Sequence, residues 1–194
     1  MYHIRHFPSF CNVMKIKTEL NHRTQATRMA IGNAILDELE ENEFSQIKVT
    51  DVIRRANVSR MSFYRYYENL YDALCDYLNI VVNGYMIEGG EKEDPNVFMR
   101  PEHIEFSLNY FDRYARYFLV LNSHGLYSIL IDAVNEYMMK NILPQKKLHM
   151  YELYAYAGGL LNSFLKWEED GKKENVHNVA MTIHRLYSHE EREI

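Results

Sequence analysis

The sequence predicts an all-α fold with a small N-terminal helical unit and a larger C-terminal helical region. Apolar residues recur at three- and four-residue steps along most of the chain, which is the spacing of amphipathic helices. No stretch alternates apolar and polar residues for long, so strands are not expected. The segment 88–101 concentrates glycine, proline and charge between two helical regions, and we place the boundary between the units inside it.

The N-terminal unit is expected to span residues 15–68 as three helices. Residues 1–14 precede it as an extension; the first part lacks the apolar region of a secretory signal and is either flexible or a start placed too early. A long amphipathic helix is predicted over 16–39. A connecting helix over 69–87, capped by Asn69, follows the unit.

Two short helices follow the long one. Thr50 is the candidate N-cap of the first, because its hydroxyl can accept a bond from a free N–H at the helix start. Asn57 ends that helix, since asparagine tolerates the left-handed conformation of a tight turn. Ser59 is the N-cap of the second short helix, which begins at Arg60 and ends at Tyr66 or Tyr67.

The C-terminal region is expected to form a helical domain over residues 102–190. Its predicted helices cover 104–118, 126–143, 149–169 and 174–189. Pro144 terminates the second of these, because proline cannot donate the next helical hydrogen bond. Gly171 lies where the C-terminal stop of a helix is expected.

Composition narrows the class of protein. The 194-residue chain is 47% hydrophobic and 25% charged, which is ordinary for a soluble protein. A mean hydropathy of -0.41 and the lack of a long apolar run argue against a spanning helix, so no membrane partner is expected. Cys11 and Cys75 lie far apart without metal-ligand spacing, which predicts free thiols in a reducing, cytoplasmic compartment.

Two short helices joined by a tight turn form a helix-turn-helix, whose second helix has the size to enter the DNA major groove. The net charge is -5, but the segment 44–67 holds five positive residues against one negative residue, a local net charge of +4. At the leading turn of the second helix, three residues offer contacts to bases. Arg60 can bond guanine, Met61 can contact a thymine methyl group, and Ser62 can donate or accept.

The segment TDVIRRANVSRMSFYRYYENLYDAL, residues 50–74, resembles the DNA-binding domain of the TetR family of transcriptional regulators. The shared features are the threonine that opens the second helix, the turn ANVS at 56–59 and the aromatic run FYRYY at 63–67. The resemblance implies that Phe63 and Tyr67 belong to the core. It implies phosphate contacts from Thr50, Tyr64 and Tyr66, a cap and a backbone or base contact from Ser59, and base contacts from Arg60, Met61 and Ser62.

Two positions depart from the family pattern. Asn57 replaces the usual glycine of the turn, which asparagine accommodates. Leu70 stands where many members have a lysine that holds a phosphate, so we expect the loss of about one unit of counterion release and weaker binding. Lys48, which we count among the DNA-binding residues, or Arg65 can offset this loss.

The C-terminal region resembles a TetR-type regulatory domain of the kind seen in Firmicutes-like members. The resemblance covers FDRYARYFLVLNSHG at 111–125 and YAGGLLNSFLKWEEDGKKENVHNVAMTI at 156–183. In that family the last two helices build a homodimer, and small residues here would let a partner helix approach closely. The predicted dimer residues are Ala155, Gly158, Gly159, Asn162, His177 and Ala180.

An aromatic stripe in the C-terminal region has two interpretations. Its side chains either line a pocket for a small hydrophobic or aromatic effector or fill the core. The residues assigned to the pocket are Tyr110, Tyr114, Phe118, Tyr137, Tyr154 and Phe164.

The predicted function is a homodimeric transcription regulator that acts as a repressor on a pseudo-palindromic operator and that a small-molecule effector can release. The alternative is a protein-interaction module that keeps the helix-turn-helix scaffold without sequence-specific DNA binding, and Leu70 motivates it. We expect no enzyme, because no glycine-rich phosphate loop, nucleophile elbow or pair of catalytic carboxylates stands out. No cofactor is expected, and the nine histidines show no metal-binding spacing.

Overall fold

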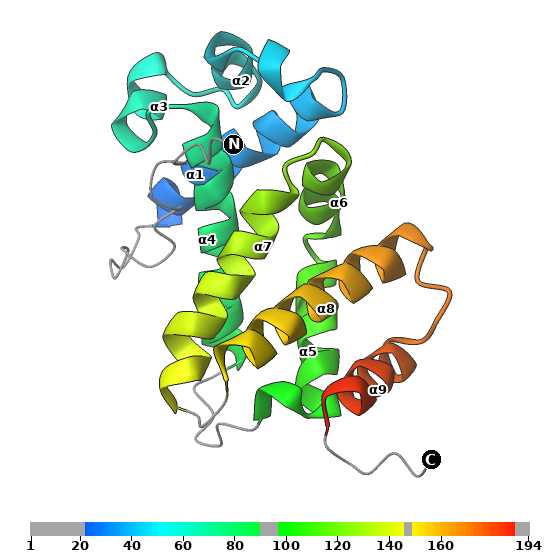
Figure 1. Ribbon diagram of the computed structural model, residues 1–194. Coiled ribbons are helices and arrows are strands. Elements are labelled where there is room, and N and C mark those ends of the chain that lie inside the picture. Colours follow the sequence, from blue (N-terminus) through cyan, green and yellow to red (C-terminus); the bar gives the residue numbers. More distant parts are fainter. Residues whose placement is uncertain (1–21, 90–96, 146–148, 189–194) are drawn as a thin grey trace, which may run out of the picture. The chain divides into compact units, whose positions relative to one another are not determined.

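The computed structural model of the chain describes residues 22–89, 97–145 and 149–188 (Figure 1). Within these residues all regular secondary structure is helical, which confirms the predicted all-α fold. None of the helices in these ranges combines the length and the apolar character that crossing a bilayer requires. The predicted extension 1–14, the start of the predicted helix 16–39 and Cys11 lie outside the described residues.

The chain divides into two compact units, which comprise residues 1–80 and 81–194. We call them unit 1 and unit 2. The division falls inside α4 (Leu70–Gly89), which corresponds to the helix that was expected to connect the two domains. The division therefore lies upstream of the segment 88–101.

Unit 1 contains three helices before the first part of α4. They are α1 (His22–Leu39), α2 (Val49–Arg55) and α3 (Arg60–Tyr66), with a 3-10 turn (Phe44–Gln46) between the first two. Side chains with no exposed area close its core: Ile31, Ile35, Val52, Phe63 and Leu74. Because a Cβ atom at Gly32 would collide with the ring of Tyr77, glycine at this position lets α1 and α4 pack closely.

Unit 2 contains the end of α4 and the C-terminal helices. In chain order these are η2 (Val97–Met99), α5 (Pro101–Asp112), α6 (Ala115–Ser123), α7 (Tyr127–Tyr137), α8 (Met150–Glu169) and α9 (Val176–Tyr187). In this unit α9 packs against both α5 and α8 (Figure 1). Gly171 follows α8 with φ of 70°, as expected for a helix stop.

The predicted bounds of two helices in unit 2 were wrong. The stripe over 104–118 is divided between α5 and α6, because Tyr114 leaves helical geometry with φ of -120° and ψ of 17°. The helix predicted to end at 143 is α-helical only to Tyr137 and continues as a π turn (Met138–Ile142) and a 3-10 turn (Leu143–Gln145). Pro144 lies inside that last turn.

A buried carboxylate lies near the end of α8. The side chain of Glu168 is 3% exposed, and its Oε1 has no hydrogen-bond partner in the described structure. Its Oε2 lies 3.5 Å from Nζ of Lys172, which also pairs with Asp112 of α5. Burial, reinforced by the charge of Asp112, raises the pKa of Glu168 to about 7, although Lys172 acts in the opposite direction.

Replacing Glu168 by glutamine should raise the free energy of unfolding near pH 8 by on the order of 1 kcal/mol, and change it little near pH 5. The pKa of Glu168 is higher in the folded protein than its ordinary value, so the folded state loses stability as the pH rises through about 7. Urea unfolding of both proteins at the two pH values measures the difference.

Glu169→Gln is the matched control, because Glu169 is the exposed neighbour on the same helix. This variant should show no such pH-dependent gain. If Glu168→Gln is instead less stable than the parent at the higher pH, Glu168 contributes as an ionised partner of Lys172, and the expectation is wrong.

Candidate nucleic-acid interface

The turn between α2 and α3 sets the direction of α3. Asn57 has φ of 52°, in the left-handed region, which confirms the predicted turn. The Val58 N–H then donates to the Ile53 carbonyl at 3.0 Å and closes the end of α2. Ser59 is the N-cap of α3, as predicted, because its Oγ accepts from the Ser62 N–H at 3.0 Å.

The predicted cap of α2 was wrong. This helix begins at Val49, and Lys48, with an extended backbone, occupies the N-cap position without a side-chain hydrogen bond. The Lys48 carbonyl accepts from the Asp51 and Val52 N–H groups, so the backbone is already helical when it reaches Thr50. Lys48 and Thr50 are both exposed, and their phosphate contacts remain predictions.

A buried charged cluster, formed by Arg28 of α1, Asp76 of α4 and Tyr67 after α3, holds the end of α3. Arg28 Nε donates to Asp76 Oδ2 at 2.6 Å, and a second guanidinium nitrogen bonds Oδ1. The Tyr67 hydroxyl donates to the same Oδ2 at 2.6 Å. Burial, together with the charge of Asp76, raises the pKa of Tyr67 well above its ordinary value, so this hydroxyl keeps its proton.

Phe63 sets the rotation of α3 about its axis. Its side chain has no exposed area, and its ring packs edge-on against those of Tyr64 and Tyr67, at 5.3 and 5.5 Å between centres. Phe63 and Tyr67 therefore lie in the core, as the family resemblance implies. Since helical side chains three or four residues apart share a face, this inward anchor directs a different set outward.

The outward face of α3 consists of Arg60, Met61, Tyr64 and Arg65. Met61 is 78% exposed and Tyr64 is 48% exposed. The guanidinium carbon of Arg60 lies 5.5 Å from the centre of the Tyr64 ring, which is a cation–π contact. A planar cation, an apolar thioether and a phenol hydroxyl therefore project together from one short helix.

Two other positions of the predicted interface, and the position of the missing family lysine, are less accessible. Ser62 and Tyr66 are half-buried, and Ser62 Oγ lies 2.9 Å from Ser59 Oγ, so the Ser62 hydroxyl takes part in the cap. Leu70, at the first position of α4, is buried. The position that matches the family lysine therefore belongs to the core of unit 1.

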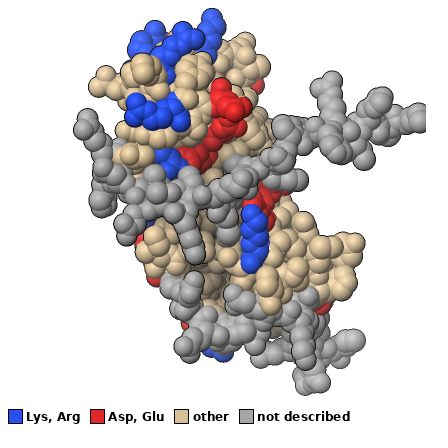
Figure 2. Space-filling view, turned by 90° about the vertical axis from the view of Figure 1, so that its left-hand side faces the viewer, with Lys and Arg blue, Asp and Glu red and all other residues tan. Residues whose placement is uncertain are grey.

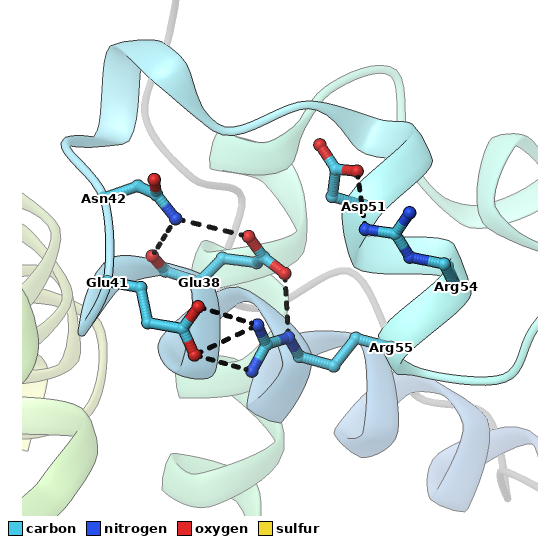
Figure 3. A network of polar contacts seen from close by, with 6 residues as sticks. All are labelled: Glu38, Glu41, Asn42, Asp51, Arg54 and Arg55. Atoms are coloured by element: carbon cyan, nitrogen blue, oxygen red, sulfur yellow. Dashed lines mark hydrogen bonds and ion pairs between the residues drawn. The ribbon is translucent and has the colours of Figure 1, made fainter.

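Carboxylates of unit 1 neutralise two of its arginines (Figure 3). Arg55 Nε donates to Glu38 Oε1 at 2.7 Å, and a terminal nitrogen of the same guanidinium donates to Glu41 at 3.2 Å. Arg54 donates to Asp51 at 2.9 Å. These ion pairs reduce the positive charge that Arg54 and Arg55 can offer to an anionic partner.

Three cations of the segment 44–67 have no carboxylate partner within the described part of the chain. They are Lys48, Arg60 and Arg65, and all three are exposed. Figure 2 shows lysine and arginine side chains gathered at the end of unit 1 where Figure 1 draws α2 and α3. Sequence reasoning found the positive segment, but it could not show which of its charges are neutralised.

The aromatic residues assigned to an effector pocket are distributed between core and surface. Tyr110, Phe118 and Phe164 are buried, and Phe118 packs edge-on against Phe164 with 5.2 Å between ring centres. Tyr114 and Tyr137 are half-buried, whereas Tyr154 is 43% exposed. The buried members contribute to the core of unit 2, and a ligand contact for this set remains a prediction.

The residues assigned to a dimer interface also fall into two groups. Ala155, Asn162 and His177 are exposed, and Gly158 is partly exposed. At Gly158 an added Cβ atom would meet nothing within 4 Å. The other two residues are explained by packing inside the monomer: a Cβ atom at Gly159 would collide with the Tyr187 hydroxyl, and Ala180 has no exposed area.

Among the described residues, no group of three or more histidine, cysteine, aspartate or glutamate side chains is placed to hold a metal ion. Cys75 is a buried free thiol.

Comparison with known proteins gives matches in structure alone. No known family and no curated protein matches the sequence. The solved structure of Lin0861 from Listeria innocua is 16% identical, with a TM-score of 0.72, over 88% of this chain and 94% of that one.

Two further solved structures share the fold. The fatty acid degradation regulator FadR from Bacillus halodurans is 15% identical, with a TM-score of 0.55, over 84% of this chain and 98% of that one. The dihydroxyacetone kinase operon activator DhaS is 17% identical, with a TM-score of 0.51, over 83% and 93%. At these identities the likeness establishes the helical fold.

Replacing Asp76 by alanine should lower the free energy of unfolding by about 3–5 kcal/mol, because Arg28 would become a buried charge without its partner. The double replacement Arg28→Met with Asp76→Leu removes both charges and should recover part of the loss, because the buried Tyr67 hydroxyl would still lack its acceptor. Urea unfolding of the three proteins measures both effects.

Asp51→Ala is the control, because it breaks an exposed ion pair with Arg54 and should change stability by less than about 1 kcal/mol. If the single and double variants of the buried charged cluster lose equal free energy of unfolding, the pairing of Arg28 with Asp76 is not what stabilises the cluster.

Proposed function

We propose that this chain is a DNA-binding transcription regulator whose α3 enters the major groove. The outward face of α3 carries the proposal, since it presents two arginines without described carboxylate partners beside an exposed methionine and tyrosine. A short helix after a tight turn, with an exposed N-terminal turn, suits entry into the groove. Two proteins of the same fold are described as a regulator and an operon activator, which supports the proposal.

The finer proposal is a homodimer on a pseudo-palindromic operator. Two copies of α3 would then enter successive major grooves about one helical turn apart. Unit 2 offers a surface for the second copy on α8, where Tyr151, Tyr154, Ala155 and Asn162 are exposed around Gly158 at helical spacing. The open space at Gly158 would let a partner helix approach closely.

We also propose repression, with release by a small hydrophobic or aromatic effector bound in unit 2. The TetR-like sequence pattern supports this, together with the concentration of aromatic side chains in that unit. An effector can release DNA only if it favours a conformation that binds DNA less well. Deleting the gene in a reporter strain distinguishes repression from activation. Expression of the regulated reporter rises if the chain is a repressor and falls if it is an activator.

A protein partner in place of DNA is the second candidate. It is favoured by the buried Leu70, which provides no charge for a phosphate, and by the largely exposed apolar side chain of Met61. Contact with a protein through the outward face would not require a cation at position 70 to hold a DNA phosphate.

Arg65→Ala should weaken binding to every DNA sequence and reduce the slope of log affinity against log salt concentration by about one unit. The reason is that Arg65 is exposed on α3 and would release one counterion when it meets a phosphate. Fluorescence anisotropy with a labelled duplex at several salt concentrations measures the slope.

Arg55→Ala is the matched control, since Arg55 is already held by Glu38 and Glu41 and its loss should leave the slope almost unchanged. If Arg65→Ala has the same slope of log affinity against log salt concentration as the parent protein, Arg65 does not contact a phosphate. If the parent protein shows no salt-sensitive binding to DNA at low salt, the protein-partner candidate is favoured.

Gly158→Arg should convert the dimer to monomers, because a long charged side chain would occupy the space left for the partner helix. Sedimentation velocity measures the assembly, and circular dichroism checks the fold. Asn109→Arg, at an exposed position of α5, is the control and should stay dimeric. A parent protein that sediments as a monomer would overturn the homodimer, and a dimeric Gly158→Arg protein would overturn this surface.

A further inference from the structure

The first turn of α3 exposes a guanidinium and a thioether on consecutive residues. Arg60 and Met61 are consecutive and both exposed. Consecutive Cα atoms lie about 3.8 Å apart. Base pairs along DNA rise by about 3.4 Å. The step between the two residues is therefore comparable to the step between adjacent base pairs, and both side chains can reach base edges when the start of the helix points into the major groove.

The Arg60 guanidinium is restrained and free to donate two hydrogen bonds in one plane. Its guanidinium carbon lies 5.5 Å from the centre of the Tyr64 ring, one helical turn further on, and this contact restrains the side chain. No carboxylate within the described residues competes for its donors. In the major groove, guanine presents two acceptors, O6 and N7, which a guanidinium can bond at once.

Met61 has different chemistry. Its side chain is apolar, carries no strong donor and is 78% exposed, so it gains free energy by covering apolar surface. The thymine methyl group is the apolar feature of the major-groove edge. A thymine beside the guanine therefore suits Met61 better than any other base.

Ser62 is assigned to the cap of α3. Its N–H donates to Ser59 Oγ at 3.0 Å, and the two hydroxyl oxygens lie 2.9 Å apart. A hydroxyl that is held in this way and is half-buried is less available for a base than the exposed side chains of Arg60 and Met61. Base reading by the first turn is thus concentrated in two residues.

We propose that each operator half-site contains a G·C pair next to an A·T pair, with Arg60 on guanine O6 and N7 and Met61 on the thymine methyl group. This inference rests on the proposed DNA-binding function and specifies the DNA that the outward face of α3 recognises.

The test begins with selection of binding sites by the full-length protein from a randomised duplex pool. The selected duplex is then made with 7-deazaguanine in place of the guanine, or with uracil in place of the thymine. The first change removes only the N7 acceptor, and the second removes only the methyl group. Binding to each duplex is measured for the parent protein, Arg60→Ala and Met61→Ala.

The parent protein should bind the 7-deazaguanine duplex about tenfold more weakly. It should bind the uracil duplex about fourfold more weakly, as expected for one buried methyl group. Met61→Ala should lose sensitivity to uracil and keep sensitivity to 7-deazaguanine, and Arg60→Ala should show the converse. Both residues are exposed, so both variants should fold normally by circular dichroism.

Two results would overturn the inference while leaving sequence-specific DNA binding intact. One is a selected half-site without adjacent G·C and A·T pairs. The other is unchanged sensitivity to the modified bases in the two variants. If the pool yields no enriched sequence and the protein binds no duplex at low salt, the proposed function fails as well.

Discussion

The buried charged cluster of Arg28, Asp76 and Tyr67 is the interaction on which the arrangement of unit 1 depends. Transfer of two charges from water into a core is unfavourable unless the geometry is good and the remaining polar atoms are bonded. Here both oxygens of Asp76 accept hydrogen bonds, from Arg28 and from Tyr67. Because these residues come from α1, from α4 and from the position after α3, the cluster forms only when all three segments are in register.

The distribution of charge then defines the surface that we propose to contact DNA. Glu38 and Glu41 of the α1 region hold Arg55, whereas Arg60 and Arg65 project from α3 without described carboxylate partners. With Leu70 in the core, residues 22–80 of unit 1 offer few free cations, so counterion release from this part of the chain should contribute modestly to affinity. Under the proposed function, binding would depend more on contacts to base edges than on attraction to phosphates.

Local signals in the sequence predicted much of the fold. Features formed by residues far apart in the sequence could not be predicted from such signals. Asn57 and Ser59 were predicted correctly because a left-handed turn and a hydroxyl cap are set by neighbouring residues. The pairing of Arg28 with Asp76 joins residues 48 positions apart and has no local pattern. The break at Tyr114 was also missed, since the apolar spacing continues across it.

A footprint on the DNA that flanks the gene for this chain is the most direct test of the claim that α3 binds the major groove. We predict two protected segments centred about one helical turn apart, on the same face of the duplex. We also predict that Arg60→Ala weakens protection of both segments. The absence of sequence-selective protection at low salt, with a correctly folded protein, would contradict the claim.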